Sequence, residues 1–311
     1  MVPDQVGPPI SVIVCSRTRP QLVNDCVESL LRSRYAAFEI VIVDNTAHGE
    51  LARTAWADDR IRVVIEPIQG LSRARNAGVR AARYDIMAFI DDDVIVDPGW
   101  LMAVATTLND DGIAGVTGLV VPLALDTRAE REFEWYGGMG KGSERRVFRG
   151  SSLSGWRTLR IQDVGVGANM IFRRSVFKQV GGFDEALGAG TMTLGSEDLD
   201  FFHRVLRHGL TVCYEPSARV SHRHRRTIEE LRAQVGANGC AYGVYLMKIW
   251  SCRTVARTEV TAFAVWWLAE RVATLLFRAV ARPGLRFLLA WDECRGILRA
   301  PRAYRLAYRL L

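Results

Sequence analysis

The 311-residue chain has very little lysine and no paired cysteines. Only three of its 41 basic residues are lysines, so its positive charge is almost all arginine. The six cysteines show no Cys-x-x-Cys pair and no zinc-ligand spacing, which predicts reduced, buried thiols instead of disulfides or a zinc site. Residues 1–9 lack the basic segment of a secretory signal. The longest uncharged run of the apolar tail, 260–269, is about half of what a membrane-spanning helix needs, so these absences predict a cytosolic protein.

The composition is that of a globular protein with an uneven charge distribution. Hydrophobic residues make up 49% of the chain and charged residues 24%, which suffices for one large core or two modest ones. Residues 1–222 carry 25 basic and 28 acidic side chains, a net charge of −3. Residues 223–311 carry 16 and 6, a net charge of +10. The C-terminal part is therefore electrostatically distinct from the rest.

Short β-branched runs alternate with helical patterns along the first third of the chain. The runs cover 9–15, 38–43, 61–65 and 86–90, and a helical spacing of apolar residues follows Pro20. This alternation predicts βαβ units and a doubly wound, mostly parallel sheet. Such sheets bind ligands beyond the carboxyl ends of their strands.

Three adjacent carboxylates follow the run at 86–90. Asp91, Asp92 and Asp93 repel one another, and a divalent cation is an economical counter-charge at a strand end. Because side chains alternate along an extended chain, Asp91 and Asp93 would face one cation while Asp92 points elsewhere. A solvated acidic turn is the alternative for an isolated triplet. Other polar groups predicted at the same edge favour a site.

Those polar groups end other strands or begin the helices after them. Asp44 suits a ribose or a base edge, and nearby guanidinium groups suit a phosphate. Alternatively, Asp44 is a turn residue and the arginines form a solvated helix face. The set is Ser16, Arg17, Asp44, Arg73, Arg75 and Asn76.

A second polar cluster lies between residues 165 and 226. Glu197 and Asp198 fall in the first turn of a predicted helix, where acidic residues are ordinary, but they also follow a Gly-rich loop. His222 and His224 stand two apart on an extended segment. They are either structural residues or ligands of a metal or phosphate. The segment 126–156 looks like a long, partly mobile insertion, whose aromatic residues either cover an acceptor or pin the loop.

These motifs, in this order, resemble the family-2 inverting glycosyltransferases, which have the GT-A nucleotide-sugar fold. The resemblance spans about residues 9–250 and rests on 10–20, 40–46, 74–78, 89–93, 181–185 and 195–200. It implies an α/β catalytic domain at 1–225, with a nucleotide-sugar half at about 9–120 and an acceptor half at about 121–225. Residues 226–311 are then a basic, apolar helical extension.

The resemblance also assigns the donor-binding residues. Asp44 would contact the nucleoside, and Ser16 and Arg17 would line the base pocket. The remaining nucleotide-sugar contacts would be Arg73, Arg75, Asn76, Asp91 and Asp92.

The same resemblance assigns the metal and the base. Asp91 and Asp93 match the family's DxD carboxylates, with Asp93 as the direct ligand of Mn²⁺ or Mg²⁺, and His222 matches a further metal or diphosphate contact. Asp198, beside Glu197, matches the general base. The cation would neutralise the leaving diphosphate while the base deprotonates the attacking hydroxyl.

Several features of the reaction stay open from the sequence. Asn45 stands where aspartate is commoner, so the donor could be a UDP, dTDP or GDP sugar. The acceptor hydroxyl could belong to a lipid-linked molecule, a natural product or a glycan. A sugar-nucleotide nucleotidyltransferase is a rival, but the first loop has no glycine and no lysine precedes Lys141. A non-catalytic protein that binds nucleotides or nucleic acid through its arginines is another rival, but no nucleic-acid motif is present, so we expect no nucleic-acid partner.

The tail after residue 228 has a helical pattern with Trp266 and Trp267 in its most apolar part. Three roles remain: a subdomain packed on the catalytic domain, a basic amphipathic surface on anionic lipid at the inner face of the membrane, or a homo-oligomer interface. Two arginine stripes would form if Pro283 and Pro301 did not break the helices. They are Arg271, Arg278, Arg282 and Arg286, and Arg295, Arg299, Arg302, Arg305 and Arg309.

Overall fold

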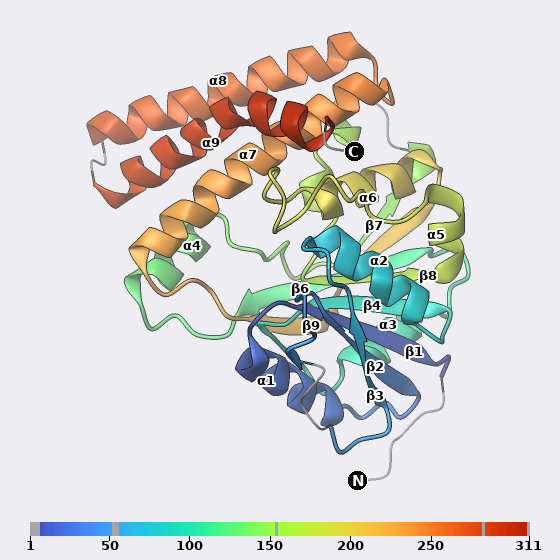
Figure 1. Ribbon diagram of the computed structural model, residues 1–311. Coiled ribbons are helices and arrows are strands. Elements are labelled where there is room, and N and C mark those ends of the chain that lie inside the picture. Colours follow the sequence, from blue (N-terminus) through green and yellow to red (C-terminus); the bar gives the residue numbers. More distant parts are fainter. Residues whose placement is uncertain (1–6, 52–55, 153–154, 282–283, 310–311) are drawn as a thin grey trace.

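The computed structural model describes residues 7–51, 56–152, 155–281 and 284–309. One twisted sheet carries helices on both faces, and three long C-terminal helices form a further layer beside it (Figure 1). The strand order is β3-β2-β1-β4-β8-β6-β9-β5, with β7 paired to β9. The α/β fold expected from the sequence is confirmed.

The first half of the sheet is parallel. Its strands are β1 (Ile10–Ser16), β2 (Phe38–Asp44), β3 (Ile61–Ile65) and β4 (Ile86–Asp91). Every residue of β1 and β2 is buried, which explains why they appear as continuous apolar runs in the sequence. The four strands lie where the sequence predicts them.

The second half of the sheet contains both parallel and antiparallel strand pairs, and it sets the position of His222. Its strands are β5 (Val94–Val96), β6 (Gly115–Pro122), β7 (Arg146–Arg149), β8 (Asn169–Arg173) and β9 (Thr211–His222). Strand β8 runs antiparallel to β4, and β5 runs antiparallel to β9. The β5–β9 register sets His222 opposite Val94, next to the acidic triplet.

Helices cover the two sheet faces. Residues of α1 (Pro20–Leu31) and α3 (Trp100–Thr107) pack into one buried cluster with the sheet. Residues of α2 (Leu71–Ala81), α5 (Arg174–Val180) and α6 (Glu197–Arg207) pack into a second cluster on the other face. Short 3₁₀ helices occur at Gly150–Ser152, Gly155–Thr158 and Ile161–Asp163.

The segment 126–156 is more ordered in secondary structure than the expected insertion. It contains α4 (Arg128–Tyr136), which begins with a capping box between Thr127 and Glu130, and it contributes β7 to the sheet. The Tyr136 hydroxyl donates to Glu293 at 2.5 Å, and the Arg286 guanidinium lies 3.5 Å from the centre of the Trp135 ring. The aromatics of α4 thus fasten it to the C-terminal helices.

Three helices form the C-terminal layer: α7 (Ile228–Cys252), α8 (Arg257–Ala281) and α9 (Leu285–Ala307). Helices α7 and α9 approach closely because Gly239 and Gly296 have no side chains; a Cβ on either would collide with backbone of the other helix. Helix α8 is the outermost of the three (Figure 1). Pro301 lies inside α9, so it does not end the helix as the sequence suggested it might.

The first expected arginine stripe does not form one helical face, because α8 and α9 are separate helices. Arg282 and Pro283 lie outside the described residues. Arg271 pairs with Glu270 and Glu293, Arg278 lies over the Tyr136 ring at 4.8 Å, and Arg286 pairs with Glu132. Of the second stripe, Arg295, Arg299, Arg302 and Arg305 are exposed on α9, and Arg309 is exposed just beyond its end.

Helix α8 corrects the expectation, drawn from the length of its uncharged runs, that no segment of the tail is long enough to span a membrane. The stretch Arg257–Val280 is long and apolar enough to cross a membrane by length and composition, although its longest uncharged run is short. Only 11% of its most apolar window is buried, so most of that apolar surface is exposed. The six cysteines are free thiols. Four of them are buried, as predicted, whereas Cys252 is exposed and Cys294 is half-buried.

Candidate functional site

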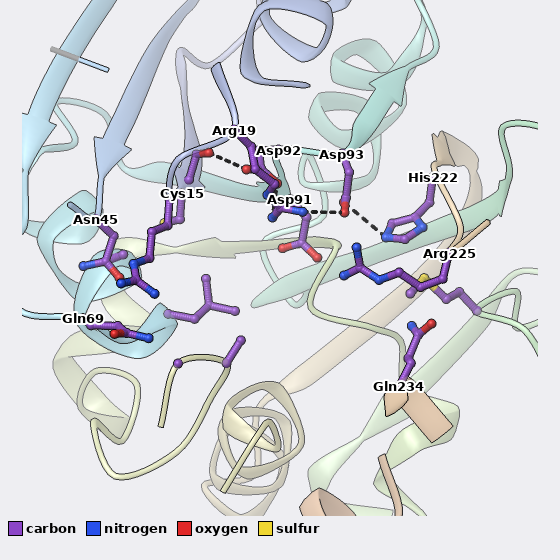
Figure 2. Close-up of a pocket in the computed structure, with 17 residues that line it drawn as sticks. Cys15, Arg19, Asn45, Gln69, Asp91, Asp92, Asp93, His222, Arg225 and Gln234 are labelled. Carbon is purple, nitrogen blue, oxygen red and sulfur yellow. Dashed lines mark hydrogen bonds and ion pairs between the residues drawn. The ribbon is translucent and has the colours of Figure 1, made fainter. Parts of the chain in front are cut away.

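The acidic triplet lies in the tight connection between β4 and β5. Asp91 ends β4, and Asp92 and Asp93 form the turn before Val94. Asp91, Asp93 and His222 each direct one ligand atom to a common point, with these atoms within 4.8 Å of one another (Figure 2). Asp92 points elsewhere, as the alternation of side chains predicts.

Asp92 and Asp93 share a guanidinium partner, Arg19, to which no sequence motif pointed. Arg19 pairs with Asp92 and lies 3.1 Å from Asp93, and Ser16 donates a hydrogen bond to Asp92. Burial raises the pKa of Asp92 to about 6 despite Arg19. Burial also raises the pKa of Asp93, but nearby His222 and Arg19 lower it more, to about 2. Asp93 is therefore a carboxylate at neutral pH.

A chain of polar contacts runs from Asp93 to α4. His222 Nε2 lies 3.2 Å from Asp93 Oδ1, and its Nδ1 lies 3.2 Å from Nδ1 of His224. His224 Nε2 lies 2.8 Å from Glu134, and burial lowers the pKa of His224, which favours its neutral form. A neutral His224 that donates to Glu134 accepts from Nδ1–H of His222. When a cation takes the place of the proton on His222 Nε2, the lone pair of that nitrogen would face the ion.

This arrangement fits a divalent cation. Asp93 Oδ1 is buried without a hydrogen bond of good geometry, although it lies 3.2 Å from His222 Nε2. A divalent cation between the two would be coordinated by both atoms. Two carboxylates and an imidazole suit Mn²⁺, and the His222–His224–Glu134 contacts would hold the imidazole in the ligating tautomer.

A cavity of about 350 Å³ adjoins the cluster on the side of the β1 carboxyl end. Ser16, Arg17 and Arg19 line it from the end of β1, and Asn45 and Gln69 line it farther along the edge. Figure 2 shows Arg225 and Gln234 across the cavity from the aspartates. The structure thus brings Ser16, Arg17 and the acidic triplet together, as the sequence predicts.

Three expected donor contacts are placed differently. Asp44 is fully buried at the end of β2, where it accepts hydrogen bonds from Thr46 and from the Leu51 N–H. Arg73 pairs with Glu185 at 2.6 Å, and Asn76 bonds to the Phe183 backbone. Among the described residues, Asp44, Arg73 and Asn76 are not in the lining of this cavity or of the adjoining one. A direct contact of these side chains with the donor would need them to leave their present partners.

Asp198 lines a second cavity, of about 460 Å³, that shares Leu71, Asp91, Met139 and Gln234 with the first. The helix α6 places Asp198 in its first turn, as predicted. The two oxygens of the Asp198 carboxylate accept from the N–H groups of Gly167 and Leu199, both at 2.8 Å. The carboxylate is thereby held facing the cavity.

Arg75 joins the two carboxylate clusters. Its buried guanidinium contacts Glu197 at 2.7 Å, Asp91 at 3.2 Å and the Gly167 carbonyl at 3.1 Å. Burial raises the pKa of Glu197 to about 7 although Arg75 opposes the shift. Arg75 thus lies among protein carboxylates and holds Glu197. The phosphate contact expected from the sequence stays a prediction.

Comparison with known proteins decides the family. A family model described as glycosyltransferase like family 2 matches residues 8–241. The chain belongs to glycosyltransferase family 2.

This family-2 glycosyltransferase has relatives among characterised sequences. It is 30% identical over 227 residues to the glucosyl-dolichyl phosphate glucuronosyltransferase of Haloferax volcanii, and the match covers 69% of each chain. It is also 30% identical over 164 residues to the pre-mycofactocin glycosyltransferase of Mycobacterium tuberculosis, covering 52% of this chain and 32% of that one.

A solved structure supports the GT-A fold. The mannosyltransferase PcManGT from Pyrobaculum calidifontis, in complex with GDP-Man and Mn²⁺, superposes with a TM-score of 0.62. The match covers 96% of this chain and 88% of that one at 16% identity, so the likeness concerns the fold. The nucleotidyltransferase and nucleic-acid-binding alternatives are set aside by the family membership.

Proposed function

We propose that this family-2 glycosyltransferase transfers a sugar from a nucleotide diphosphate sugar to an acceptor hydroxyl, with metal dependence and inversion at the anomeric carbon. One observation carries the proposal: the Asp91–Asp93–His222 cluster and the Asp198 carboxylate line two adjoining cavities. Donor and acceptor can thus approach each other from opposite sides. Residues 1–225 would be the catalytic unit, and 226–311 the helical extension.

On the donor side, Ser16 and Arg17 would contact the nucleotide in the first cavity. Asp91, Asp93 and His222 would hold Mn²⁺ or Mg²⁺, which neutralises the departing diphosphate as a Lewis acid. The Mn²⁺ bound by the Pyrobaculum enzyme makes manganese the first ion to test. UDP, dTDP and GDP sugars remain the donor candidates. Asp44, Arg73 and Asn76 would support the site from behind, and Arg75 would position Asp91 beside the leaving group.

On the acceptor side, Asp198 would accept the proton of the attacking hydroxyl. The oxygen then forms its bond to the anomeric carbon as the bond from that carbon to the diphosphate oxygen breaks on the opposite face. The two N–H groups that bind Asp198 fix its orientation for this role. Glu197 would act by positioning, since its carboxylate is bound to Arg75.

The C-terminal helices support a further part of the proposal, contact with a membrane. Leu276, Phe277 and Val280 expose 63%, 64% and 87% of their surface on α8, and the α9 arginine stripe is exposed as well. Apolar and cationic surface together suit an anionic bilayer. We therefore propose that the protein is cytoplasmic and acts at the inner face of the membrane, and self-association through these helices is the competing arrangement.

The experiment that tests the proposed chemistry is the Asp198→Asn variant. Transfer should fall by about 10²–10⁴-fold, because the base is lost, while metal-dependent nucleotide binding stays close to that of the wild type. Asp111→Asn is the matched control, since that side chain is fully exposed on a distant loop. Near-normal turnover of Asp198→Asn would remove Asp198 from the mechanism.

A further inference from the structure

A third cavity, of about 440 Å³, lies between the three C-terminal helices. Leu246, Met247 and Trp250 line it from α7, Val265 and Leu268 from α8, and Ile297 from α9. No charged side chain lines it among the described residues, and Ser251 and Thr261 are its polar members. We call this cavity the helical groove. Its size is that of a small-molecule site, and its chemistry is that of an alkyl or isoprenoid chain.

The helical groove meets the cavity of the proposed base at one side chain. Trp267 lines both the groove and the Asp198 cavity. The Trp267 ring is held in place by the Tyr242 ring, whose centre lies 4.7 Å away, and Tyr242 is itself bonded to the Leu159 carbonyl at 3.0 Å. Trp267 is thus the side chain common to the linings of a cavity that contains a carboxylate and of an apolar cavity.

The groove also opens to the outer surface. Val265 is 63% exposed and Leu268 and Trp250 are each 41% exposed, so the groove is continuous with the apolar surface of α8. Exposed apolar surface of this kind marks a binding site or an interface. The wall that the groove shares with the Asp198 cavity favours a ligand with one polar and one apolar end over a second copy of the chain, which would need no contact with the Asp198 side.

We propose that the helical groove binds the apolar chain of an amphiphilic acceptor, whose hydroxyl-bearing head lies in the Asp198 cavity. The position of the head rests on the proposed function; the site of the chain does not. Trp267 separates the two parts and directs the head toward Asp198. The acceptor class is therefore a hydroxyl-bearing head joined to an alkyl or isoprenoid chain.

Binding of the chain is testable without transfer. The fluorescent fatty acid 11-(dansylamino)undecanoic acid is titrated into the full-length protein, and octyl glucoside or glucose is then added as competitor. We expect saturable binding that octyl glucoside reverses and glucose does not. Val265→Asp should weaken the binding at least ten-fold, because each buried methylene contributes about four-fold in affinity and a carboxylate at the groove mouth excludes the chain.

Leu276→Asp is the matched control, since Leu276 is also 63% exposed on α8 but does not line the groove. It should bind the probe within about two-fold of the wild type. Equal loss in both variants, or no saturable binding by the wild type, would overturn the proposal. A wild-type dimer that Val265→Asp converts to a monomer, measured by light scattering, would also overturn it in favour of self-association.

A transfer assay then tests the link through Trp267. With an active donor, octyl glycoside acceptors should show a KM at least ten-fold below that of the methyl glycosides. That advantage should be lost in Trp267→Ala and kept in Trp266→Ala, whose indole is 46% exposed and lines neither cavity. An advantage that survives in Trp267→Ala would contradict the link. Absence of transfer to every acceptor, with probe binding intact, would count against the proposed function and not against the groove.

Discussion

Replacing Lys248 by methionine should destabilise the protein by breaking a buried charge network between the catalytic domain and the C-terminal helices. Lys248 on α7 contacts Asp184 at 2.6 Å and Asp200 at 2.5 Å. Asp200 is also bound by Arg204 at 2.8 Å, and Asp184 accepts from the Tyr308 hydroxyl at 2.7 Å. Lysine is scarce in this chain, and Lys248 is the basic residue that links α7 to α6.

The magnitude follows from what the change leaves behind. The side chain of Asp200 is 1% exposed and that of Asp184 is 20% exposed, so water cannot fully replace the ammonium group. Removing one partner of a buried pair costs about 3–5 kcal/mol. Because Arg204 and Tyr308 remain, we expect the lower end, about 3 kcal/mol, which lowers Tm by about 5–10 °C.

Urea denaturation followed by tryptophan fluorescence measures the difference in unfolding free energy. Lys178→Met is the control: Lys178 is exposed on α5, so its replacement should change stability by at most about 0.5 kcal/mol. A second substitution, Asp200→Asn, removes one of the stranded charges and should recover part of the loss. If Lys248→Met were as stable as Lys178→Met, the network would not hold the helical layer to the catalytic domain.

Two further predictions concern pH and the metal. Burial raises the pKa of Asp184, but Lys248 and Tyr308 lower it more, so the folded-state pKa lies below the ordinary value. This stabilisation is present above the ordinary Asp pKa of about 4 and is lost as the pH falls through the folded-state pKa, so the wild type and Lys248→Met should converge in urea denaturation as the pH falls below about 4. Glu134→Gln should weaken Mn²⁺ binding in calorimetry by about 10–100-fold, because it no longer fixes the tautomers of His224 and His222; unchanged affinity would show that the chain of contacts does not orient the ligand.

The sheet edge that carries the acidic triplet was predictable because its signals are local. A buried parallel strand requires an apolar run, and carboxylates that end it must lie at the sheet edge, so Asp91 and Asp93 follow from a few consecutive residues. The first turn of α6, with Asp198, follows in the same way from an apolar stripe with a C-terminal glycine. The capping box at Thr127 and Glu130 is an equally local signal for α4, although the segment 126–156 as a whole resembles a long loop.

Other features depend on pairings between distant segments. Arg75 and Glu197 are 122 residues apart, and only the tertiary fold brings α2 and the start of α6 close enough for their contact. The pairing of β5 with β9 sets His222 beside Asp93. Arg19 had no signal that distinguished it from its neighbour Arg17, because its partners come from the turn after β4. Such contacts arise from tertiary structure, which one sequence does not specify by spacing alone.

The most direct test of the account is a thermal-shift titration with UDP, GDP and dTDP, each with and without Mn²⁺, on the wild type and on Asp93→Ala. Binding at a hundred times Kd adds about 2.7 kcal/mol of stability, which is readily visible as a rise in Tm. The account predicts that one nucleotide stabilises the wild type only with Mn²⁺ and that Asp93→Ala abolishes the shift. Stabilisation of equal size in Asp93→Ala, or without Mn²⁺, would contradict a metal-assisted donor site at the acidic triplet.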